Sequence, residues 1–156
     1  MLIEPGSEAP DFELKTSTGE TFRLSDLRGH LRAMLVFYPK DFTPGCTDQL
    51  NHIGRHLPGF RAAGIEPIGV NPGDAASHER FRTELGLDFA LLVDEGAQVA
   101  RAYGAIKRGG EGIERSVVVV GRHGKVIFAE RGAPPWQRIM NATRVITEDL
   151  DEPVNA

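Results

Sequence analysis

An uninterrupted run of apolar residues at positions 33–38 limits the fold of this chain more than any other feature. The run has the length of a strand, and a strand that is apolar on both faces is typical of the centre of a sheet covered on both sides. Pro39 ends the run, because proline cannot donate a backbone hydrogen bond within a sheet. The sequence therefore predicts a buried central strand with other elements packed on both of its faces.

After a short loop, the apolar residues change to the spacing of a helix, and this pattern continues as far as Gly64. The residues that share one helix face are Cys46, Leu50, Ile53, Leu57 and Phe60. Further strands are expected over residues 65–70, 90–93, 113–120 and 125–129. Further helices are expected after Asp74, around residues 99–103 and after Pro135. Residues 12–14 and 21–24 flank a turn and predict an opening hairpin.

Strands that alternate with helices, followed by a hairpin and a closing helix, predict an α/β domain of three layers with a mixed central sheet. The order of elements suggests a thioredoxin-like core with an added N-terminal β-hairpin. The closing helix is expected to present Ile139, Met140, Thr143 and Ile146 on one face. With 156 residues the chain suits one full-sized core rather than two, so a single domain over residues 1–156 is expected.

The charges and the apolar runs disfavour some classes of function. The formal net charge is −4 and no long basic run occurs, so binding to nucleic acid or to an acidic membrane is not expected. The longest apolar runs, such as residues 117–120, are far shorter than a membrane span. No basic stretch followed by an apolar one opens the sequence, and a single cysteine cannot form a disulfide within the chain. A cytoplasmic protein is therefore expected.

The single cysteine, Cys46, follows the expected central strand at the start of the next helix. Ligands of open α/β sheets bind at the carboxyl ends of the strands. Pro44 suits the first helical position, which places Thr43 at the N-cap and Cys46 in the first turn. Unpaired backbone N–H groups and the helix dipole at that point favour a thiolate, the nucleophilic form of cysteine. The residues alone leave a second interpretation open, in which Cys46 is an inert core residue in line with Leu50.

The segment around Cys46 resembles the signature of the peroxiredoxin family. That signature is a proline, then a threonine four residues later, then a cysteine three residues after the threonine. Pro39, Thr43 and Cys46 occupy these positions here. Residues 37–47 as a whole are similar to the subgroup known as bacterioferritin comigratory protein, or peroxiredoxin Q. The resemblance extends to the opening and to the arginine-bearing strand of the family, at residues 6–12 and 112–116. It therefore covers nearly the whole chain and implies a thiol-dependent peroxidase.

The resemblance implies a role for each of five residues. Cys46 would attack the O–O bond of hydrogen peroxide or an organic hydroperoxide and become a sulfenic acid. Thr43 would hydrogen-bond the peroxide, and Pro39 would shield the pocket from water. Arg115 would stabilise the thiolate and the charge that develops on the oxygens, and Gln49 would orient Arg115. Thr43 and Pro39 can act at the same time as helix cap and strand end.

The expected position of Arg115 in a strand supports its role without the family. Side chains alternate along a strand, so Arg115 shares a side with Ile113 and Val117. A guanidinium on a buried side needs an anionic or hydrogen-bonding partner, although a surface arginine at a strand end fits the same pattern. Gln49 lies about 60° around the helix from Cys46, close enough to be its neighbour. Taken alone, Gln49 would be interpreted as an ordinary solvated glutamine.

One departure from the subgroup decides the expected chemical cycle. Many members carry a second, resolving cysteine five residues after the first, and here that position is Asn51. A sulfenic acid on Cys46 then has no internal thiol with which to condense. We therefore expect a one-cysteine cycle completed by an external thiol, which is thioredoxin, glutaredoxin or a low-molecular-weight thiol. A monomer or a weak homodimer suits the subgroup.

Other interpretations rest on weaker patterns. His52 and His56 have the spacing of a metal-binding pair, but helical geometry turns them about 120° and 80° from Cys46, and a solvated helix face is favoured. The other histidines, including His78, show no pairing pattern, and neither a metal nor a cofactor is expected. A thioredoxin-type disulfide exchanger would need a cysteine in place of Gln49. A peroxide-sensing module that signals to a partner through oxidation of Cys46 is the alternative function.

Overall fold

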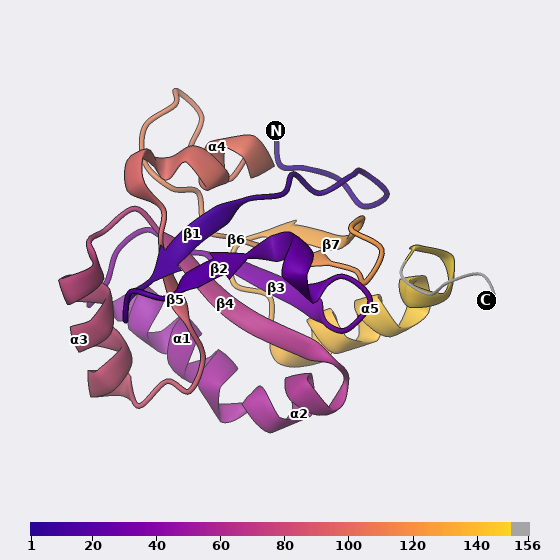
Figure 1. Cartoon of the computed structure of the whole chain (residues 1–156), viewed down its shortest axis with the longest axis horizontal. Helices are drawn as coiled ribbons and strands as arrows, with labels where there is room; N and C mark the ends of the chain where they lie inside the picture. The colour runs from indigo at the N-terminus through magenta and orange to yellow at the C-terminus, as the bar shows by residue number, and fades with distance from the viewer. Residues whose placement is uncertain (151–156) are drawn as a thin grey trace.

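The central strand predicted from the apolar run is β3 (Arg32–Phe37), and every residue in it is buried. In the computed structural model, which describes residues 1–150 and side chains as far as residue 144, β3 lies within a mixed sheet of seven strands (Figure 1). It pairs with the parallel strand β4 (Ile65–Asn71) on one side and with the antiparallel strand β6 (Ser116–Val120) on the other. Every residue of the three strands except Glu66 is buried, because both faces of the sheet are covered.

The strand order across the sheet is β2-β1-β5-β4-β3-β6-β7. The remaining strands are β1 (Glu13–Thr16), β2 (Thr21–Arg23), β5 (Leu91–Val93) and β7 (Val126–Arg131). The predicted N-terminal hairpin is formed by β1 and β2, and β1 pairs antiparallel with β5, so that the hairpin extends the central sheet. The strands β6 and β7 form the predicted second hairpin. The architecture is the predicted three-layer α/β arrangement around a mixed sheet.

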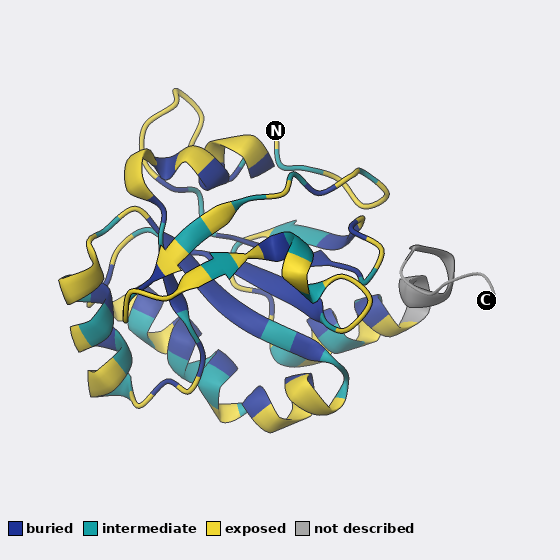
Figure 2. Cartoon of the chain, in the orientation of Figure 1, coloured by how far each residue is buried: buried dark blue, intermediate teal, exposed yellow. Residues whose placement is uncertain are grey.

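Helices cover both faces of this sheet (Figures 1 and 2). They are α1 (Pro44–Arg55), α2 (Leu57–Ala62), α3 (Ala75–Leu85), α4 (Gln98–Tyr103) and α5 (Trp136–Leu150), with short 3-10 helices η1 (Leu24–Leu27) and η2 (Glu95–Ala97). Side chains alternate along β3. Met34 and Val36 therefore pack with α1, α2, α3 and α5, whereas Leu35 and Phe37 pack on the other face with α4 and η1.

The helix expected to run to Gly64 is divided at His56, where α1 ends and α2 begins. Pro58 explains the division, because it lacks the N–H that would continue α1 and is tolerated in the first turn of α2. The five apolar residues predicted to share one face nevertheless all belong to the same core cluster. In α5, Ile139 and Thr143 are buried as expected, whereas the side chain of Ile146 lies outside the described residues.

The strand expected over residues 113–120 begins three residues later, at Ser116. Ile113 forms an isolated bridge with Ile106 and packs in the core on the α4 face, whereas Val117 packs on the α1 face. The expectation that Arg115 shares a side with both residues is therefore wrong. Gly112, at φ +80°, turns the chain there, so that Glu114 N–H donates to Ala105 O before the strand begins.

The edges of the sheet are protected in different ways. At one edge, β2 has three residues, and short edge strands resist pairing with other chains. At the other edge, backbone hydrogen bonds join Gly6 N to Val126 O and Val126 N to Ser7 O, so the N-terminal segment covers the start of β7. Within residues 1–150, no helix has the length and apolar character needed to cross a membrane.

Candidate active site

The structure places Cys46 in the first turn of α1, at the carboxyl end of β3, and the residue is completely buried. Thr43 occupies the predicted N-cap position with extended backbone angles, and Pro44 opens the helix. The Thr43 side chain makes no capping hydrogen bond to the helix, and its hydroxyl donates to Lys40 O at 2.9 Å. Thr43 therefore begins the helix through its backbone and uses its side chain to close the preceding loop.

Arg115 reaches Cys46 from the segment that leads into β6. Its Nη2 donates a hydrogen bond to Cys46 Sγ at 3.5 Å, and its Nη1 donates to Gln49 Oε1 at 2.7 Å. Gln49 is only 6% exposed, so its interpretation as a solvated glutamine is wrong. The structure thus brings together Cys46, Gln49 and Arg115, with Arg115 on the α1 side that Val117 shares, as expected, and Ile113 on the other side.

Gly45 gives the guanidinium room to approach the helix. A Cβ atom at this position would lie 3.1 Å from Arg115 Nη2, closer than side-chain atoms normally approach. The absent side chain therefore allows a cation to lie beside the sulfur. A neighbouring arginine and a helix N-terminus are the surroundings in which a cysteine sulfur serves as a nucleophile.

Pro39 lies on the loop between β3 and α1, where the side-chain amide of Asn71 holds the backbone. Asn71 Nδ2 donates to Tyr38 O at 2.7 Å and to Pro39 O at 2.9 Å. Asn71 is the last residue of β4, the neighbouring parallel strand. The carboxyl ends of the two strands are therefore joined at the point where the candidate site begins.

A buried polar cluster lies at the same loop, and the sequence interpretation missed it. Asp41 accepts three hydrogen bonds of 2.7 Å, from Tyr38 Oη to Oδ1 and from Ser77 Oγ and His78 Nδ1 to Oδ2. No pairing pattern in the sequence involves His78, yet the structure pairs it with Asp41. Asp41 and His78 are 37 positions apart, and no spacing rule joins them. The sequence feature that could have indicated this cluster is the N-cap residue Asp74, because it places Ser77 and His78 in the first turn of a helix at the carboxyl end of a strand.

The cluster shifts the ionisation of its members. Burial would raise the pKa of the Asp41 carboxyl, but hydrogen bonds from His78, Tyr38 and Ser77 outweigh burial and lower it. Burial would lower the pKa of His78, yet the hydrogen bond and the charge of Asp41 raise it. Burial and then the charge of Asp41 raise the pKa of Tyr38. The arrangement favours a carboxylate facing a protonated imidazole ring.

His52 and His56 are engaged with α5. His52 Nε2 accepts a hydrogen bond of 3.1 Å from the backbone N–H of Trp136, and the His56 ring stacks on the Trp136 ring with centroids 4.6 Å apart. Among the side chains that the structure describes, no group of three or more His, Cys, Asp and Glu residues could hold a metal ion. The two histidines therefore join helices, in place of the solvated face that the sequence favoured.

A groove of about 490 Å³ opens beside the guanidinium of Arg115. Its walls come from α1 and from the segment before α5, and its lining residues are Gly45, Asp48, Gln49, His52, Ile53, Arg115, Ala133, Pro134 and Pro135.

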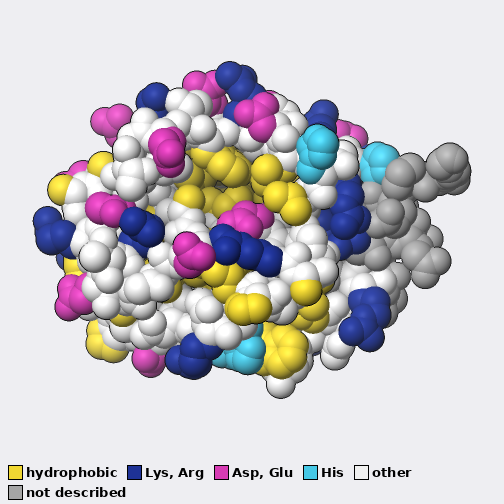
Figure 3. Space-filling view, turned by 60° about the horizontal axis from the view of Figure 1, so that its bottom comes forward, with side chains coloured by type: hydrophobic (Ala, Val, Ile, Leu, Met, Phe, Trp, Pro, Cys, Tyr) yellow, Lys and Arg dark blue, Asp and Glu magenta, His cyan; other side chains and the backbone are white. Residues whose placement is uncertain are grey.

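On the face shown in Figure 3, basic side chains are interspersed with acidic ones around an area of apolar side chains, so that face presents no continuous basic surface.

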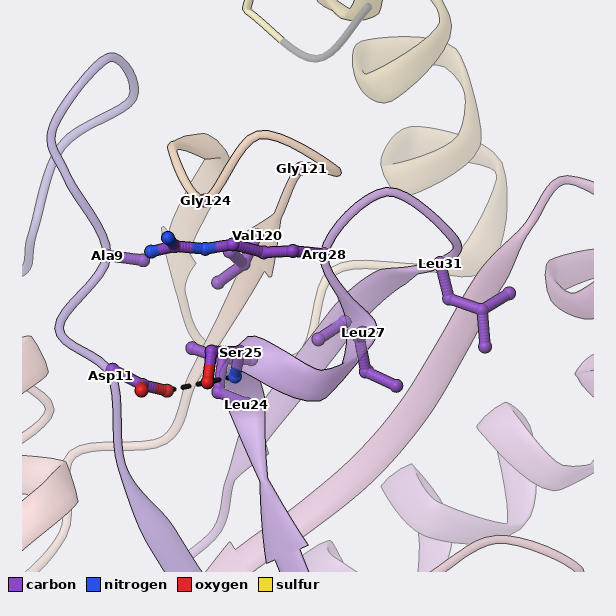
Figure 4. Close-up of a pocket in the computed structure, with 11 residues that line it drawn as sticks. Ala9, Asp11, Leu24, Ser25, Leu27, Arg28, Leu31, Val120, Gly121 and Gly124 are labelled. Carbon is purple, nitrogen blue, oxygen red and sulfur yellow. Dashed lines mark hydrogen bonds between the residues drawn. The ribbon is translucent and has the colours of Figure 1, made fainter.

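A second hollow, of about 10 Å³, lies at the opposite ends of the strands (Figure 4). It is lined by Ala33, near the start of β3, and by Val120, at the end of β6, whereas Cys46 follows the end of β3. Arg28 extends across it toward Ala9, and Asp11 accepts a hydrogen bond from Ser25 N–H at 2.9 Å. This volume has room for about one water molecule, which excludes it as a substrate site.

The fold and the site together define a class of protein. An α/β domain with a mixed sheet, a cysteine in the first turn of the helix that follows the central strand, and an arginine beside its sulfur are the features of a protein with a reactive, nucleophilic cysteine. A family model described as the AhpC/TSA family matches residues 5–129, and the chain belongs to that family.

The relatives narrow the assignment within the family. The chain is 40% identical to peroxiredoxin Bcp of Bacillus subtilis (strain 168), with 97% of this chain and 99% of that protein covered. The structure of peroxiredoxin Q from Xanthomonas campestris is 30% identical, with a TM-score of 0.79 and with 96% of this chain and 98% of that chain covered. A bacterioferritin comigratory protein from the same organism, described by its alkyl peroxide reduction activity, is 31% identical with a TM-score of 0.76, covering 92% and 96%. The chain is thus a peroxiredoxin of the Bcp and peroxiredoxin Q type, a thiol-dependent peroxidase with a thioredoxin-like fold.

Proposed function

We propose that the protein reduces hydrogen peroxide and organic hydroperoxides through a one-cysteine cycle in which Cys46 is oxidised and an external thiol restores it. The observation that carries the proposal is the hydrogen bond from Arg115 Nη2 to Cys46 Sγ, in a sequence whose only cysteine is Cys46. The alkyl peroxide reduction of the Xanthomonas campestris relative supports the organic substrates.

In the first step the Cys46 thiolate attacks the terminal oxygen of the peroxide. An S–O bond forms while the O–O bond breaks, and the leaving oxygen takes a proton and departs as water or an alcohol. The sulfur is oxidised by two electrons to a sulfenic acid, and the peroxide is reduced by the same two. Arg115 stabilises the negative charge on the sulfur and on the departing oxygen.

Thr43 and Pro39 form the other side of the proposed site. The Thr43 hydroxyl donates its hydrogen to Lys40 O, which leaves the lone pairs of its oxygen to accept a hydrogen bond from the peroxide O–H. Pro39 offers an apolar ring with no N–H, which limits the access of water. Gln49 keeps the guanidinium in place by accepting a hydrogen bond from Arg115 Nη1 at 2.7 Å.

In the second step an external thiol attacks the sulfenic sulfur, and a mixed disulfide forms as water leaves. A second thiol then releases Cys46. The position of the resolving cysteine found in many relatives is Asn51, on α1, so the chain offers no internal thiol for this step. Because Cys46 is completely buried, a local opening around the first turn of α1 has to admit the peroxide, and a wider opening has to admit the larger thiol.

Steady-state peroxide consumption tests this cycle with thioredoxin, glutaredoxin and low-molecular-weight thiols supplied in parallel. We expect continuous turnover with at least one of these thiols, loss of turnover in Cys46→Ser, and a sulfenic acid adduct by mass spectrometry after one equivalent of peroxide. A disulfide-linked dimer as the main oxidised product would contradict the one-cysteine cycle. Stoichiometric oxidation without turnover would instead favour a peroxide sensor.

Gel filtration of the reduced protein tests the accompanying proposal of a monomer or weak homodimer.

A further inference from the structure

The buried pair formed by Asp41 and His78 has no part in the cycle described above, yet it lies on the loop that carries the site. Asp41 is 7% exposed and His78 is fully buried. Ionisable side chains are seldom buried this deeply unless they are paired. The depth at which both groups are buried therefore indicates that the pair has a specific role in the protein.

The hydrogen bonds of His78 define its proton state. Its Nδ1 faces Asp41 Oδ2 at 2.7 Å, and its Nε2 faces the backbone oxygen of Asn71 at 3.1 Å. A carbonyl oxygen can only accept, so Nε2 must carry a hydrogen. The carboxylate already accepts from two hydroxyl groups, which keeps the proton between Asp41 and His78 on the ring. His78 is then an imidazolium that donates from both nitrogens.

The pair fixes the conformation of residues 39–43. Asp41 ties this loop to α3 through Ser77 and His78. Phe42 has a left-handed backbone at φ +67°, which a residue other than glycine adopts only when its surroundings impose it. The Phe42 ring packs on Phe81 of α3, with the ring centroids 5.0 Å apart. Two consecutive residues of the loop are therefore anchored on α3, directly before Thr43.

We propose that Asp41 and His78 are positioning residues whose ion pair holds the loop from Pro39 to Thr43 in the conformation that peroxide attack by Cys46 requires. This inference rests on the proposed role of Cys46 as the nucleophile. Oxidation of Cys46 is then fast while the pair is charged and slows when either partner becomes neutral.

The direction of the pH dependence follows from the groups that surround the pair. These are Tyr38 directly after β3, Asn71 from β4, the backbone of Leu92 from β5, Ser77 from α3, and Cys46, whose charge acts on Tyr38. Because the pKa of His78 is raised, the ring loses its proton only above its ordinary range. Because the pKa of Asp41 is lowered, the carboxylate is neutralised only below its ordinary range. We therefore expect the rate of Cys46 oxidation to fall on the alkaline side as the His78 ring loses its proton.

Nuclear magnetic resonance of the ¹⁵N-labelled reduced protein tests the charge state directly. We expect protons on both ring nitrogens of His78 at pH 7.5, where an ordinary histidine is neutral. Asp41→Asn should give a neutral His78 ring. Thr83→Ala is the matched control, because Thr83 is an exposed residue of α3 whose hydroxyl bonds to Glu79 and not to Asp41, and its His78 should match that of the unaltered protein. A neutral His78 in the unaltered protein at pH 7.5 would overturn the proposal.

Single-turnover oxidation of Cys46 by hydrogen peroxide, followed by thiol loss in quenched samples, tests the link to chemistry. We expect Asp41→Asn to react about tenfold more slowly at pH 7, because small displacements of a reacting geometry have effects of this size or larger. Thr83→Ala, the control on the same helix, should stay within about twofold. In the unaltered protein, the rate should fall through the same pH range in which His78 loses its proton. An unchanged rate across that titration refutes the inference whether or not Asp41→Asn folds.

The two experiments separate the failure of this inference from the failure of the proposed function. Peroxide consumption that survives Cys46→Ser would refute Cys46 as the nucleophile and with it the proposed positioning of its loop, although the resonances of His78 would still report the ion pair. If the oxidation rate of Cys46 is normal and does not depend on the protonation state of His78, the peroxidase cycle stands and the positioning role is refuted.

Discussion

At the scale of single residues, the environment of Cys46 depends on the side chain of Arg115 and on the lack of a side chain at Gly45. Arg115 donates to Cys46 Sγ and to Gln49 Oε1, and Gly45 leaves the space that the guanidinium occupies. The loop segment with Cys46 and Thr43 could be predicted from the sequence because its order of residue types is local. The pairing of Asp41 with His78 could not, since it depends on how α3 is placed beside the end of β3.

Gly45→Ala tests whether the approach of Arg115 governs the reactivity of Cys46. The added Cβ would lie 3.1 Å from Nη2 and should displace the guanidinium, so we expect oxidation of Cys46 by peroxide to slow by about tenfold. Thiol loss under excess peroxide gives the rate. Gly59→Ala in α2 is the matched control, because its Cβ meets no atom within 4 Å. It should raise the free energy of unfolding by about 0.5–1 kcal/mol and leave the rate unchanged. Equal oxidation rates in Gly45→Ala and Gly59→Ala would show that the approach of Arg115 does not govern the reactivity of Cys46.

At the scale of helices and strands, the positions of the elements follow from the sequence more closely than their junctions. Pro58 divides the expected long helix, and β6 begins at Ser116 because the preceding residues pair with another segment. The contact between α1 and α5 was not predicted at all. It depends on His52 and Trp136, which are 84 positions apart and meet only when both helices cover the same face of the sheet.

This helix junction predicts a pH-dependent stability. Burial and the nearby charges of His56 and Arg55 lower the pKa of His52, whose Nε2 can accept from Trp136 N–H only while it is unprotonated. The unfolded chain therefore binds the proton first, and the free energy of unfolding should decrease as pH falls through the ordinary histidine range. Loss of this hydrogen bond costs about 1 kcal/mol.

Urea unfolding at pH 7.5 and pH 5 measures the effect in the unaltered protein and in His52→Gln. A glutamine oxygen can accept the same hydrogen bond without titrating, so His52→Gln should lose less stability between the two pH values. His123→Gln serves as the control, because His123 is exposed in the turn between β6 and β7 and should keep the full pH dependence. Identical pH dependence in all three proteins would show that His52 does not couple the helices.

At the scale of the whole molecule, the N-terminal segment completes the sheet. Its backbone pairs with the start of β7, and Ile3 N–H donates to Tyr103 O at 3.0 Å, so the segment connects the closing hairpin with α4. An uncovered strand edge is a template for pairing with another chain. The sequence predicts one domain over residues 1–156, and cooperative unfolding in urea would test that prediction.

Deletion of residues 1–8 should expose the edge of β7. We expect a loss of roughly 2–4 kcal/mol from the free energy of unfolding, as several backbone hydrogen bonds disappear, together with self-association at high concentration. Light scattering and urea unfolding measure the two effects. Glu8→Ala, which keeps the backbone pairing, should behave like the unaltered chain. A deleted protein that stays monodisperse and equally stable would show that the segment does not protect the edge.

The sequence by itself determined the features that are local along the chain. These are the buried central strand, the helix that begins directly after Thr43, the placement of Cys46 in its first turn, and the lack of a cysteine at Asn51. They could be predicted because strand and helix periods, proline positions and residue order act over a few neighbouring residues.

Only the tertiary structure decided which distant side chains meet. Arg115 lies 69 positions from Cys46, and His78 lies 37 positions from Asp41. His78 follows β4, whose carboxyl end lies beside that of the parallel strand β3, whereas Arg115 precedes β6, which is antiparallel to β3 and therefore begins at the same edge. Each buried charge must find a partner there. The sequence specified the position of Cys46, whereas packing supplied the guanidinium beside its sulfur and the Asp41–His78 pair behind its loop.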